Sequence, residues 1–245
     1  MKRIDKYKWN YNASIERENL NLDKDGYIDI EKVLSIHNDF TLMYREMSEN
    51  ISGMSVKDGN NKIIVVNSSL SKGRQRFTIA HELCHLLYHE GDCFVCSKNK
   101  VKEDMEKEAD LFASYFLAPM KSFNSLFLEY FNKYGSKFLS TIILENIFGI
   151  SHLATLLRLK EENLITLNEY EEYKEEKPSK HAIFLGYDID LYLPTNVNKV
   201  VGKYIKLAIE LNEKELISQG KYEELLLSAF REDLVYGEIS YGSID

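Results

Sequence analysis

The sequence predicts an α+β fold that is mostly helical, with one small antiparallel sheet and a smaller C-terminal appendage. Three features support this prediction. Short strand-like runs lie between residues 40 and 67, helical apolar patterns follow over residues 73–167, and a charged, proline-containing linker at 170–180 precedes the appendage. The 245 residues are enough for one main domain and a second, smaller one. We therefore place a main domain at residues 1–169 and a mainly helical appendage at residues 170–245.

The composition is typical of a folded protein in a reducing, aqueous compartment. Hydrophobic residues make up 44% of the chain and charged residues 29%, which argues against global disorder. The formal net charge of −8 argues against a general binder of polyanions, so we do not expect direct nucleic-acid binding. Three cysteines are too few, and odd in number, for a disulfide framework. No apolar run approaches the roughly 20 residues of a membrane span, and no signal peptide is evident, so we expect a cytoplasmic protein that does not enter a membrane.

The first predicted elements are two short helices and three strands. Residues 1–36 are polar and carry two helical patterns, the second with an N-cap at Asp29. Apolar runs then predict strands over residues 40–47, 51–58 and 61–67. The last two runs flank a turn that begins at Gly59, so they predict a hairpin, and the three runs together predict a small antiparallel sheet.

Helical patterns dominate the rest of the chain. From Gly73 the apolar residues recur at intervals of three and four positions, which indicates a helix with one buried face. A loop that contains Cys93 and Cys96 follows, then a second helix over residues 102–117, and further helices over residues 121–167. After the charged segment we expect a strand over 182–194 and helices over 196–212 and 220–232.

The clearest predicted helix contains the pattern His-Glu-x-x-His, formed by His81, Glu82 and His85. Side chains four residues apart lie on one face of a helix, about 6 Å apart along its axis, so both imidazoles can point at one ion. Neutral imidazole suits Zn²⁺, and two histidines leave positions for a third ligand and a water. Glu82 lies beside them, where its carboxylate can take a proton from that water as it attacks a carbonyl.

The second predicted helix offers the third ligand. Antiparallel packing of the two helices would bring Glu106 or Glu108 back over the histidines. These two carboxylates are about 200° apart around the helix, so only one can face the metal. Glu106 has Asp110 four residues later on its own face, and that carboxylate can accept the outward N–H of a ligating histidine. We therefore expect Glu106 as the third ligand and Asp110 as the group that orients a histidine.

Two longer stretches resemble a known family. Residues 63–89 (IIVVNSSLSKGRQRFTIAHELCHLLYH), followed by residues 105–119 (MEKEADLFASYFLAP), resemble the ImmA/IrrE family of bacterial and phage zinc-dependent metallopeptidases. With the helices after them, the resemblance covers about residues 28–167. It implies a zincin-like, mostly helical catalytic domain that hydrolyses peptide bonds. Its implied site consists of the Zn²⁺ ligands His81, His85 and Glu106 and the catalytic Glu82.

The resemblance also implies a partner. Members of the family typically cleave a transcriptional repressor or antitoxin that has a helix-turn-helix domain, which relieves repression of stress-response or mobile-element genes. We expect such a protein as the substrate, with the appendage at 170–245 active in substrate recognition or regulation. Two positions depart from the family pattern, because Cys84 replaces the usual glycine before the second histidine and Ala118 replaces the usual methionine. Neither position is a ligand.

Alternatives stay open for several residues. Cys93 and Cys96 have the spacing of metal ligands, but without a second pair they are either ordinary loop cysteines or the source of a thiol that caps the zinc. Two alternative functions for the protein also stay open. It could be a zinc-binding regulator that sequesters a partner, or a DNA-binding module over residues 136–166 with Arg158 and Lys160 in its recognition helix. The apolar periodicity of that segment favours packing instead. The candidates for stabilising an oxyanion are Tyr115, Tyr130, Tyr134 and His152.

Overall fold

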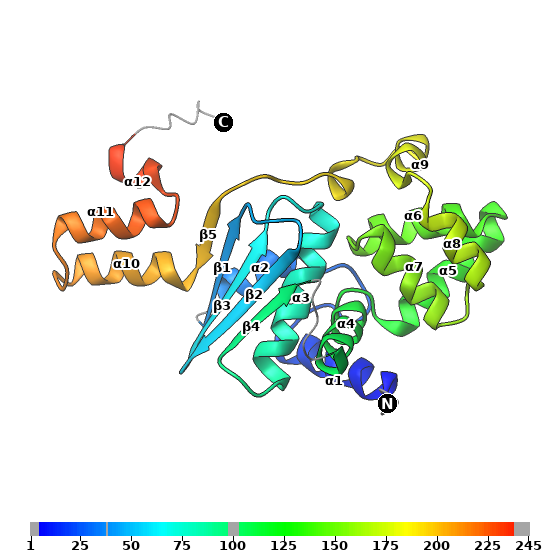
Figure 1. The fold of residues 1–245 in the computed structure, drawn as a ribbon, viewed down its shortest axis with the longest axis horizontal. Helices are drawn as coiled ribbons and strands as arrows, with labels where there is room; N and C mark the ends of the chain where they lie inside the picture. Colours follow the sequence, from blue (N-terminus) through cyan, green and yellow to red (C-terminus); the bar gives the residue numbers. More distant parts are fainter. Residues whose placement is uncertain (1–4, 38, 98–102, 238–245) are drawn as a thin grey trace.

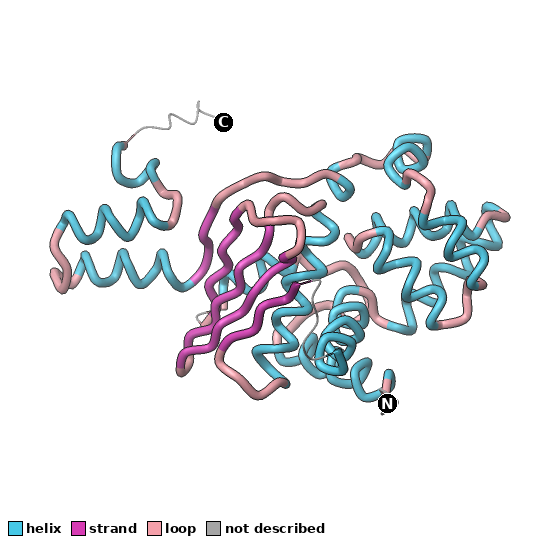
Figure 2. Tube along the Cα trace, in the orientation of Figure 1, coloured by secondary structure: helices cyan, strands magenta, loops and turns pink. Residues whose placement is uncertain are grey.

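The protein is built around one mixed β-sheet, with helices against the sheet and helical groups beyond both of its ends (Figure 1). The computed structural model describes residues 5–37, 39–97 and 103–237. The predicted α+β class is confirmed, because helices predominate and the strands gather in one small sheet (Figure 2).

Five strands form this sheet in the order β4-β2-β3-β1-β5 across the described residues. Their bounds are Phe40–Arg45 for β1, Ile51–Asp58 for β2, Asn61–Asn67 for β3, Cys93–Ser97 for β4 and Lys199–Gly202 for β5. The three strands that the sequence predicts are present. β4 lies where the sequence predicts a loop, and β5 lies where it predicts the start of a helix.

The sheet is mixed, which corrects the prediction of a purely antiparallel one. β3 lies between β2 and β1, antiparallel to β2 but parallel to β1, with Leu42 opposite Ile64. β3 is rich in isoleucine and valine, and its Ile64 and Val66 are completely buried. An apolar strand is stable in a central position, where both neighbours cover its backbone, and two chain reversals then give β1 and β3 the same direction.

The helices closest to the sheet carry the sequence motifs. Their bounds are Lys6–Asn19 for α1, Ile30–Ile36 for α2, Lys72–Tyr88 for α3 and Glu103–Leu117 for α4. α3 packs against β2 and β3, α4 packs on α3, and α1 packs on α4. The predicted apolar face of α3 is buried, since Ala80, Leu83 and Cys84 are at most 1% exposed. The core therefore fixes α3 between the sheet and α4.

A buried arginine links α1 to α4. Arg17 of α1 is 2% exposed. Its guanidinium donates hydrogen bonds to the backbone carbonyls of Asp23, Gly26 and Phe116. Phe116 lies near the end of α4, and Asp23 and Gly26 lie in a turn in which the Asp23 carboxylate accepts the Gly26 N–H at 2.7 Å. Burial lowers the pKa of Arg17 to about 10, so the group stays charged at neutral pH.

Helices α5 to α9 form a second group next to α4 (Figure 1). Their bounds are Met120–Tyr134, Lys137–Phe148, His152–Glu161, Leu167–Lys174 and Pro178–Phe184. The prediction of a linker at 170–180 is wrong, because α8 and α9 occupy most of it. Thr166 and Glu169 form a capping box that starts α8, and Pro178 is the first residue of α9.

Among the described residues, no single helix has the length and apolar character needed to cross a bilayer. The bent pair of α6 and α7, with 116° at its break, meets that criterion only when both helices are taken together.

The C-terminal part contributes β5 to the sheet. β5 pairs antiparallel with β1, with Val201 opposite Leu42. The predicted strand over 182–194 is wrong, since α9 ends there and the short 3₁₀ helix Asp190–Tyr192 follows. The helix predicted over 196–212 begins only after β5. The last helices are α10 (Lys203–Glu213), α11 (Gln219–Ser228) and α12 (Glu232–Tyr236). A domain division at residues 169 and 170 stays a prediction.

Candidate metal centre

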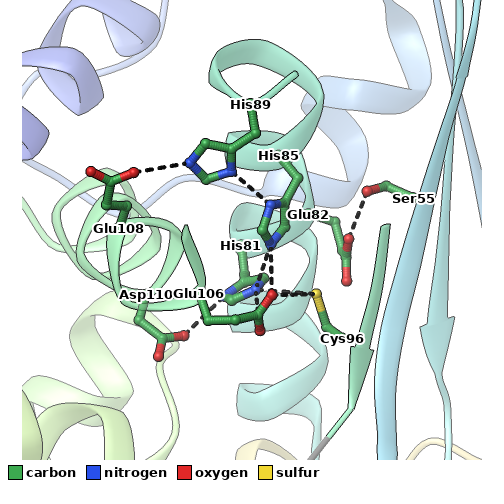
Figure 3. Close-up of polar contacts among 9 residues, drawn as sticks. All are labelled: Ser55, His81, Glu82, His85, His89, Cys96, Glu106, Glu108 and Asp110. Atoms are coloured by element: carbon green, nitrogen blue, oxygen red, sulfur yellow. Dashed lines mark hydrogen bonds and ion pairs between the residues drawn. The ribbon is translucent and has the colours of Figure 1, made fainter. Parts of the chain in front are cut away.

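Two histidines of α3 converge on one point (Figure 3). His81 and His85 lie one turn apart on the same face of the helix, with their Nε2 atoms 3.1 Å apart. Their exposed fractions are 6% and 1%, and Glu82 between them is completely buried. A helix holds residues i and i+4 at this spacing, so local geometry alone sets the pair.

α4 brings a carboxylate to these histidines. Glu106 Oε2 lies 3.6 Å from His81 Nε2, and Glu106 Oε1 lies 3.4 Å from His85 Nε2. Glu108 points to another side of α4, where its carboxylate lies 3.3 Å from His89 Nε2. The structure therefore places Glu106, and not Glu108, beside the histidine pair, in the phase that helical periodicity predicts.

Hydrogen bonds hold both imidazole rings from behind. Asp110 Oδ1 lies 2.9 Å from His81 Nδ1, which leaves the Nε2 atom of that ring facing the cluster. His85 Nδ1 lies 2.7 Å from His89 Nδ1, and His89 in turn contacts Glu108. Such partners fix the orientation and tautomer of a metal-ligating histidine. Asp110 thus lies where the sequence predicts it. His89, four residues after His85, ends α3 as its C-cap residue, and its contact with the His85 ring was not predicted.

Strand β4 adds a sulfur atom to the cluster. Cys96 Sγ lies 3.2 Å from His81 Nε2 and 3.9 Å from Glu106 Oε1. Cys93, at the start of the same strand, is exposed. The sequence offers Cys93 and Cys96 alike as the source of such a thiol and does not choose between them, because β4 forms only through its pairing with β2. The donor atoms that lie within 4.8 Å of one another belong to His81, His85, Cys96 and Glu106.

This donor set fits one tetrahedral metal ion. Bonds of about 2.0–2.3 Å from a metal to nitrogen, oxygen and sulfur place the ligand atoms of a tetrahedron roughly 3.3–3.6 Å apart. The contacts in the cluster range from 3.1 to 3.9 Å. Imidazole, carboxylate and thiolate groups are all ligands of divalent transition metals. The group has therefore both the spacing and the chemistry to hold a metal ion.

The charges of the cluster also suit a cation. Burial tends to raise the pKa of Glu106, but hydrogen bonds from His81 and His85 outweigh it and lower this pKa, so the carboxylate is charged. Burial tends to lower the pKa of His81, but hydrogen bonds with Asp110, Cys96 and Glu106 raise it well above its usual value. A metal ion must displace the proton from His81, because only the neutral imidazole is a ligand.

Glu82 lies on the side of the cluster that faces the sheet. Its Oε2 accepts a hydrogen bond of 2.7 Å from Ser55 Oγ on β2. Its Oε1 is buried and has no hydrogen-bond partner among the described residues. Burial raises the pKa of the Cys96 thiol to about 12, and the nearby carboxylate of Glu82 adds to this effect. Ser55 of the sheet thus holds Oε2 of Glu82, whereas Oε1 has no hydrogen-bond partner among the described residues.

A glycine lets β2 approach α3 closely at this point. A Cβ atom on Gly53 would lie 2.5 Å from Thr78 Cγ2, 2.9 Å from the Val65 carbonyl oxygen and 3.2 Å from Glu82 Oε1. The register between β2 and β4 shifts next to Gly53, whose partner on β4 is Cys96. Gly53 therefore sets the short distance between strand β2 and the histidine helix α3.

The cluster opens into a large cleft. Its volume is about 1940 Å³, and His81, Cys96 and Glu106 line it together with Leu153 and Leu157 of α7. Small-molecule pockets usually measure roughly 300–1,000 Å³. The two leucines are 50% and 37% exposed, so they give the cleft an apolar wall. A larger substrate with apolar side chains, such as a peptide segment, suits this cleft.

The candidates for stabilising an oxyanion divide between the cleft and the rest of the protein. His152 lines the cleft, but its ring nitrogens already contact Glu145 Oε1 at 2.6 Å and the Tyr173 carbonyl at 2.9 Å. Tyr115 is 1% exposed. The two candidates on α5, outside the residues that line the cleft, are Tyr130 and Tyr134.

The segment considered for DNA contact packs against protein instead. Arg158 of α7 is 1% exposed, and its guanidinium lies 3.6 Å from the centroid of the Tyr115 ring. It also donates hydrogen bonds to Ser114 and Glu162. Lys160 lies over the Tyr170 ring. In this arrangement Arg158 cannot reach a base edge, which agrees with packing as the role of this segment.

Comparison with known proteins assigns the chain to a family. A model of the peptidase M78 family, described as the IrrE N-terminal-like domain, matches residues 39–177, which include β1 to β4, α3 and α4. Among curated proteins none matches the chain. The match covers more than half of the chain and agrees with the resemblance seen in its motifs. The chain therefore belongs to the peptidase M78 family, with an IrrE N-terminal-like domain and a group of side chains that could bind a metal ion.

Proposed function

We propose that this protein is a zinc-dependent metallo-endopeptidase that hydrolyses a peptide bond in a partner protein. The observation that carries the proposal is the group of His81, His85 and Glu106 at a large cleft, with the carboxylate of Glu82 beside it. Membership of the peptidase M78 family supports hydrolysis of peptide bonds in general.

Zinc is the metal that we propose, with His81, His85 and Glu106 as its ligands. Two imidazoles and one carboxylate are a ligand set of catalytic zinc sites. When bound, the ion supplies a Lewis acid that polarises a carbonyl group and lowers the pKa of a water. Asp110 keeps the His81 ring in the orientation that this binding needs.

Glu82 carries out the proton transfers in this proposal. Its unpaired Oε1 accepts a proton from the water that attacks the carbonyl carbon, and it then donates that proton to the amine of the leaving peptide. The hydrogen bond from Ser55 holds Oε2, so that the carboxylate cannot turn its other oxygen away from the cluster. Ser55 is thus a positioning residue for the base.

A Ser55→Ala variant is expected to lower kcat about 10-fold, close to the ~1.5 kcal/mol that a hydrogen bond to a charged group contributes. KM is expected to stay unchanged, because Ser55 contacts the base and does not line the cleft. Steady-state kinetics on the cleaved partner checks this. Ser55→Thr keeps the hydroxyl and is expected to restore most of kcat. A Thr variant as slow as the Ala variant would contradict a positioning role.

We also propose the class of partner. The family resemblance supports a helix-turn-helix repressor or antitoxin as the substrate, and relief of repression in stress response or mobile-element control as the consequence. The size and apolar wall of the cleft support binding of a protein segment. We propose that the protein acts in the cytoplasm, because its three cysteines are free thiols, as is usual in a reducing compartment. Residues 170–245 are proposed to recognise the substrate or to regulate the site.

New protein N-termini test the proposal in cells that express either the wild type or Glu82→Gln. Bound zinc is measured in both purified proteins. We expect one zinc per chain in both proteins and new N-termini only with the wild type, and the cleaved protein then identifies the substrate. Zinc in both proteins with identical N-termini would contradict a peptidase and favour sequestration of a partner. No zinc in either protein would contradict the ligand assignment.

A further inference from the structure

The group of donor atoms includes a fourth one, the sulfur of Cys96, which the proposed hydrolysis of a peptide bond does not require. We propose that the Cys96 thiolate is the fourth ligand of the zinc and holds the enzyme in a latent form, a regulation that rests on the proposed function. Two histidines and Glu106 leave one position of a tetrahedron, which catalytic zinc sites keep open for water and substrate. Cys96 Sγ, 3.2 Å from His81 Nε2, lies at a distance that completes the tetrahedron.

The sulfur is held in place by contacts of its own strand. β4 is an edge strand that pairs with β2, and Phe94 of β4 stacks on the His85 ring at 4.8 Å between centroids and 15° between planes. Cys96 is 7% exposed and faces the cluster, whereas Cys93 is exposed. Pairing to β2 and stacking on His85 therefore select one of the two thiols and place it over the histidines.

The balance of charge favours a thiolate at this position. Zn²⁺ with two neutral imidazoles, one carboxylate and one thiolate has no net charge, and a buried site tolerates a neutral group far better than an isolated ion. A thiol that coordinates zinc is deprotonated outright, and its proton passes to solvent on binding. The four donor groups therefore form a closed site of the kind that structural zinc ions occupy.

Release of the thiolate converts the closed site into an open one. The bond between sulfur and metal breaks, the thiolate recovers a proton from solvent, and a water takes the vacated position. β4 is suited to such a movement, because an edge strand has a pairing partner on one side only and its pairing with β2 is interrupted next to Gly53. Binding of the partner protein along the cleft is the event that we expect to favour release.

Cobalt substitution tests the ligation directly in the full-length protein. Co²⁺ replaces Zn²⁺ in the wild type, in Cys96→Ala and in the matched control Cys93→Ala, and the absorption spectrum of each is recorded. A thiolate ligand gives a sulfur-to-cobalt charge-transfer band in the near ultraviolet. We expect this band in the wild type and in Cys93→Ala, and its loss in Cys96→Ala with one Co²⁺ still bound. The zinc affinity of Cys96→Ala is expected to fall by more than the about 10-fold that loss of a hydrogen bond to a ligand costs.

A measurement on the wild type alone keeps the test independent of how the variants fold. X-ray absorption at the zinc edge is expected to show one sulfur neighbour at about 2.3 Å. A spectrum that nitrogen and oxygen neighbours fit alone would overturn the proposal, as would an unchanged cobalt spectrum in Cys96→Ala. Failure of all three proteins to bind Co²⁺ or Zn²⁺ would overturn both this proposal and the metal site.

Rates of cleavage separate this proposal from the proposed function. If the open form is a minor state of about 0.1–10%, removal of the thiol is expected to speed cleavage of the partner at least about 10-fold, with no change in Cys93→Ala. Loss of the charge-transfer band without any peptide cleavage would leave the thiolate ligand standing and contradict the peptidase. Cleavage that is equally fast in the wild type and Cys96→Ala, with the band lost, would contradict latency.

Discussion

Glu82→Gln is expected to lower the rate of peptide cleavage by about 10²–10⁴-fold, the usual contribution of a general base, while the protein keeps its metal ion. Glutamine has the shape of glutamate and can still accept the hydrogen bond from Ser55, so the local structure is preserved. Its amide cannot accept a proton from water. The measurement compares cleavage rates of the identified partner with metal content in the same preparations.

Glu90→Gln is the matched control for this substitution. Glu90 lies just beyond α3 and is exposed, so the same chemical change at that position is expected to leave the cleavage rate unchanged. A Glu82→Gln variant that cleaves at the wild-type rate would contradict the role of Glu82. A variant that has lost its metal would show that this carboxylate acts as a ligand.

Arg17→Met is expected to lower the free energy of unfolding by about 3 kcal/mol or more, because three carbonyl groups lose their buried donor. The guanidinium of Arg17 donates hydrogen bonds to the carbonyl of Asp23 in the turn after α1 and to that of Phe116 near the end of α4. Urea denaturation of the metal-free protein measures the change. Since α4 carries Glu106, the affinity for zinc is expected to fall as well.

Arg45→Met provides the comparison at a surface position. Arg45 is exposed and lies 5.5 Å from the centroid of the Phe230 ring, a contact of about 0.5–1 kcal/mol at such a site. Its substitution is therefore expected to have a much smaller effect than that of Arg17. Equal unfolding free energies for the two variants would contradict the proposed role of Arg17 in joining α1 to α4.

The local part of the site follows from the sequence. His81 and His85 share one face because they are four residues apart in one helix, and no long-range contact is needed for that. The phase of α4 separates Glu106 from Glu108 in the same way. The structure agrees with both placements and with Asp110 behind His81. That His81, His85 and Glu106 bind the metal stays a prediction.

The non-local part could not be derived in this way. Ser55 and Cys96 reach the cluster only because β2 packs on α3 and β4 pairs with β2, and neither contact leaves a periodic signal in the sequence. β5 likewise forms through pairing with β1, and because the sequence does not show this pairing, we predicted its residues as the start of a helix. Signals for α8 were present in the capping box of Thr166 and Glu169, but the charge of that segment pointed to a linker.

Anomalous diffraction at the zinc edge, from crystals grown with zinc, tests the central claim most directly. The account predicts one strong peak within about 2.0–2.3 Å of His81 Nε2, His85 Nε2 and a carboxylate oxygen of Glu106. Glu82 Oε1 is expected close to the ion but outside bonding distance. A peak between His89 and Glu108, or no peak on α3, would contradict the metal site and the chemistry derived from it.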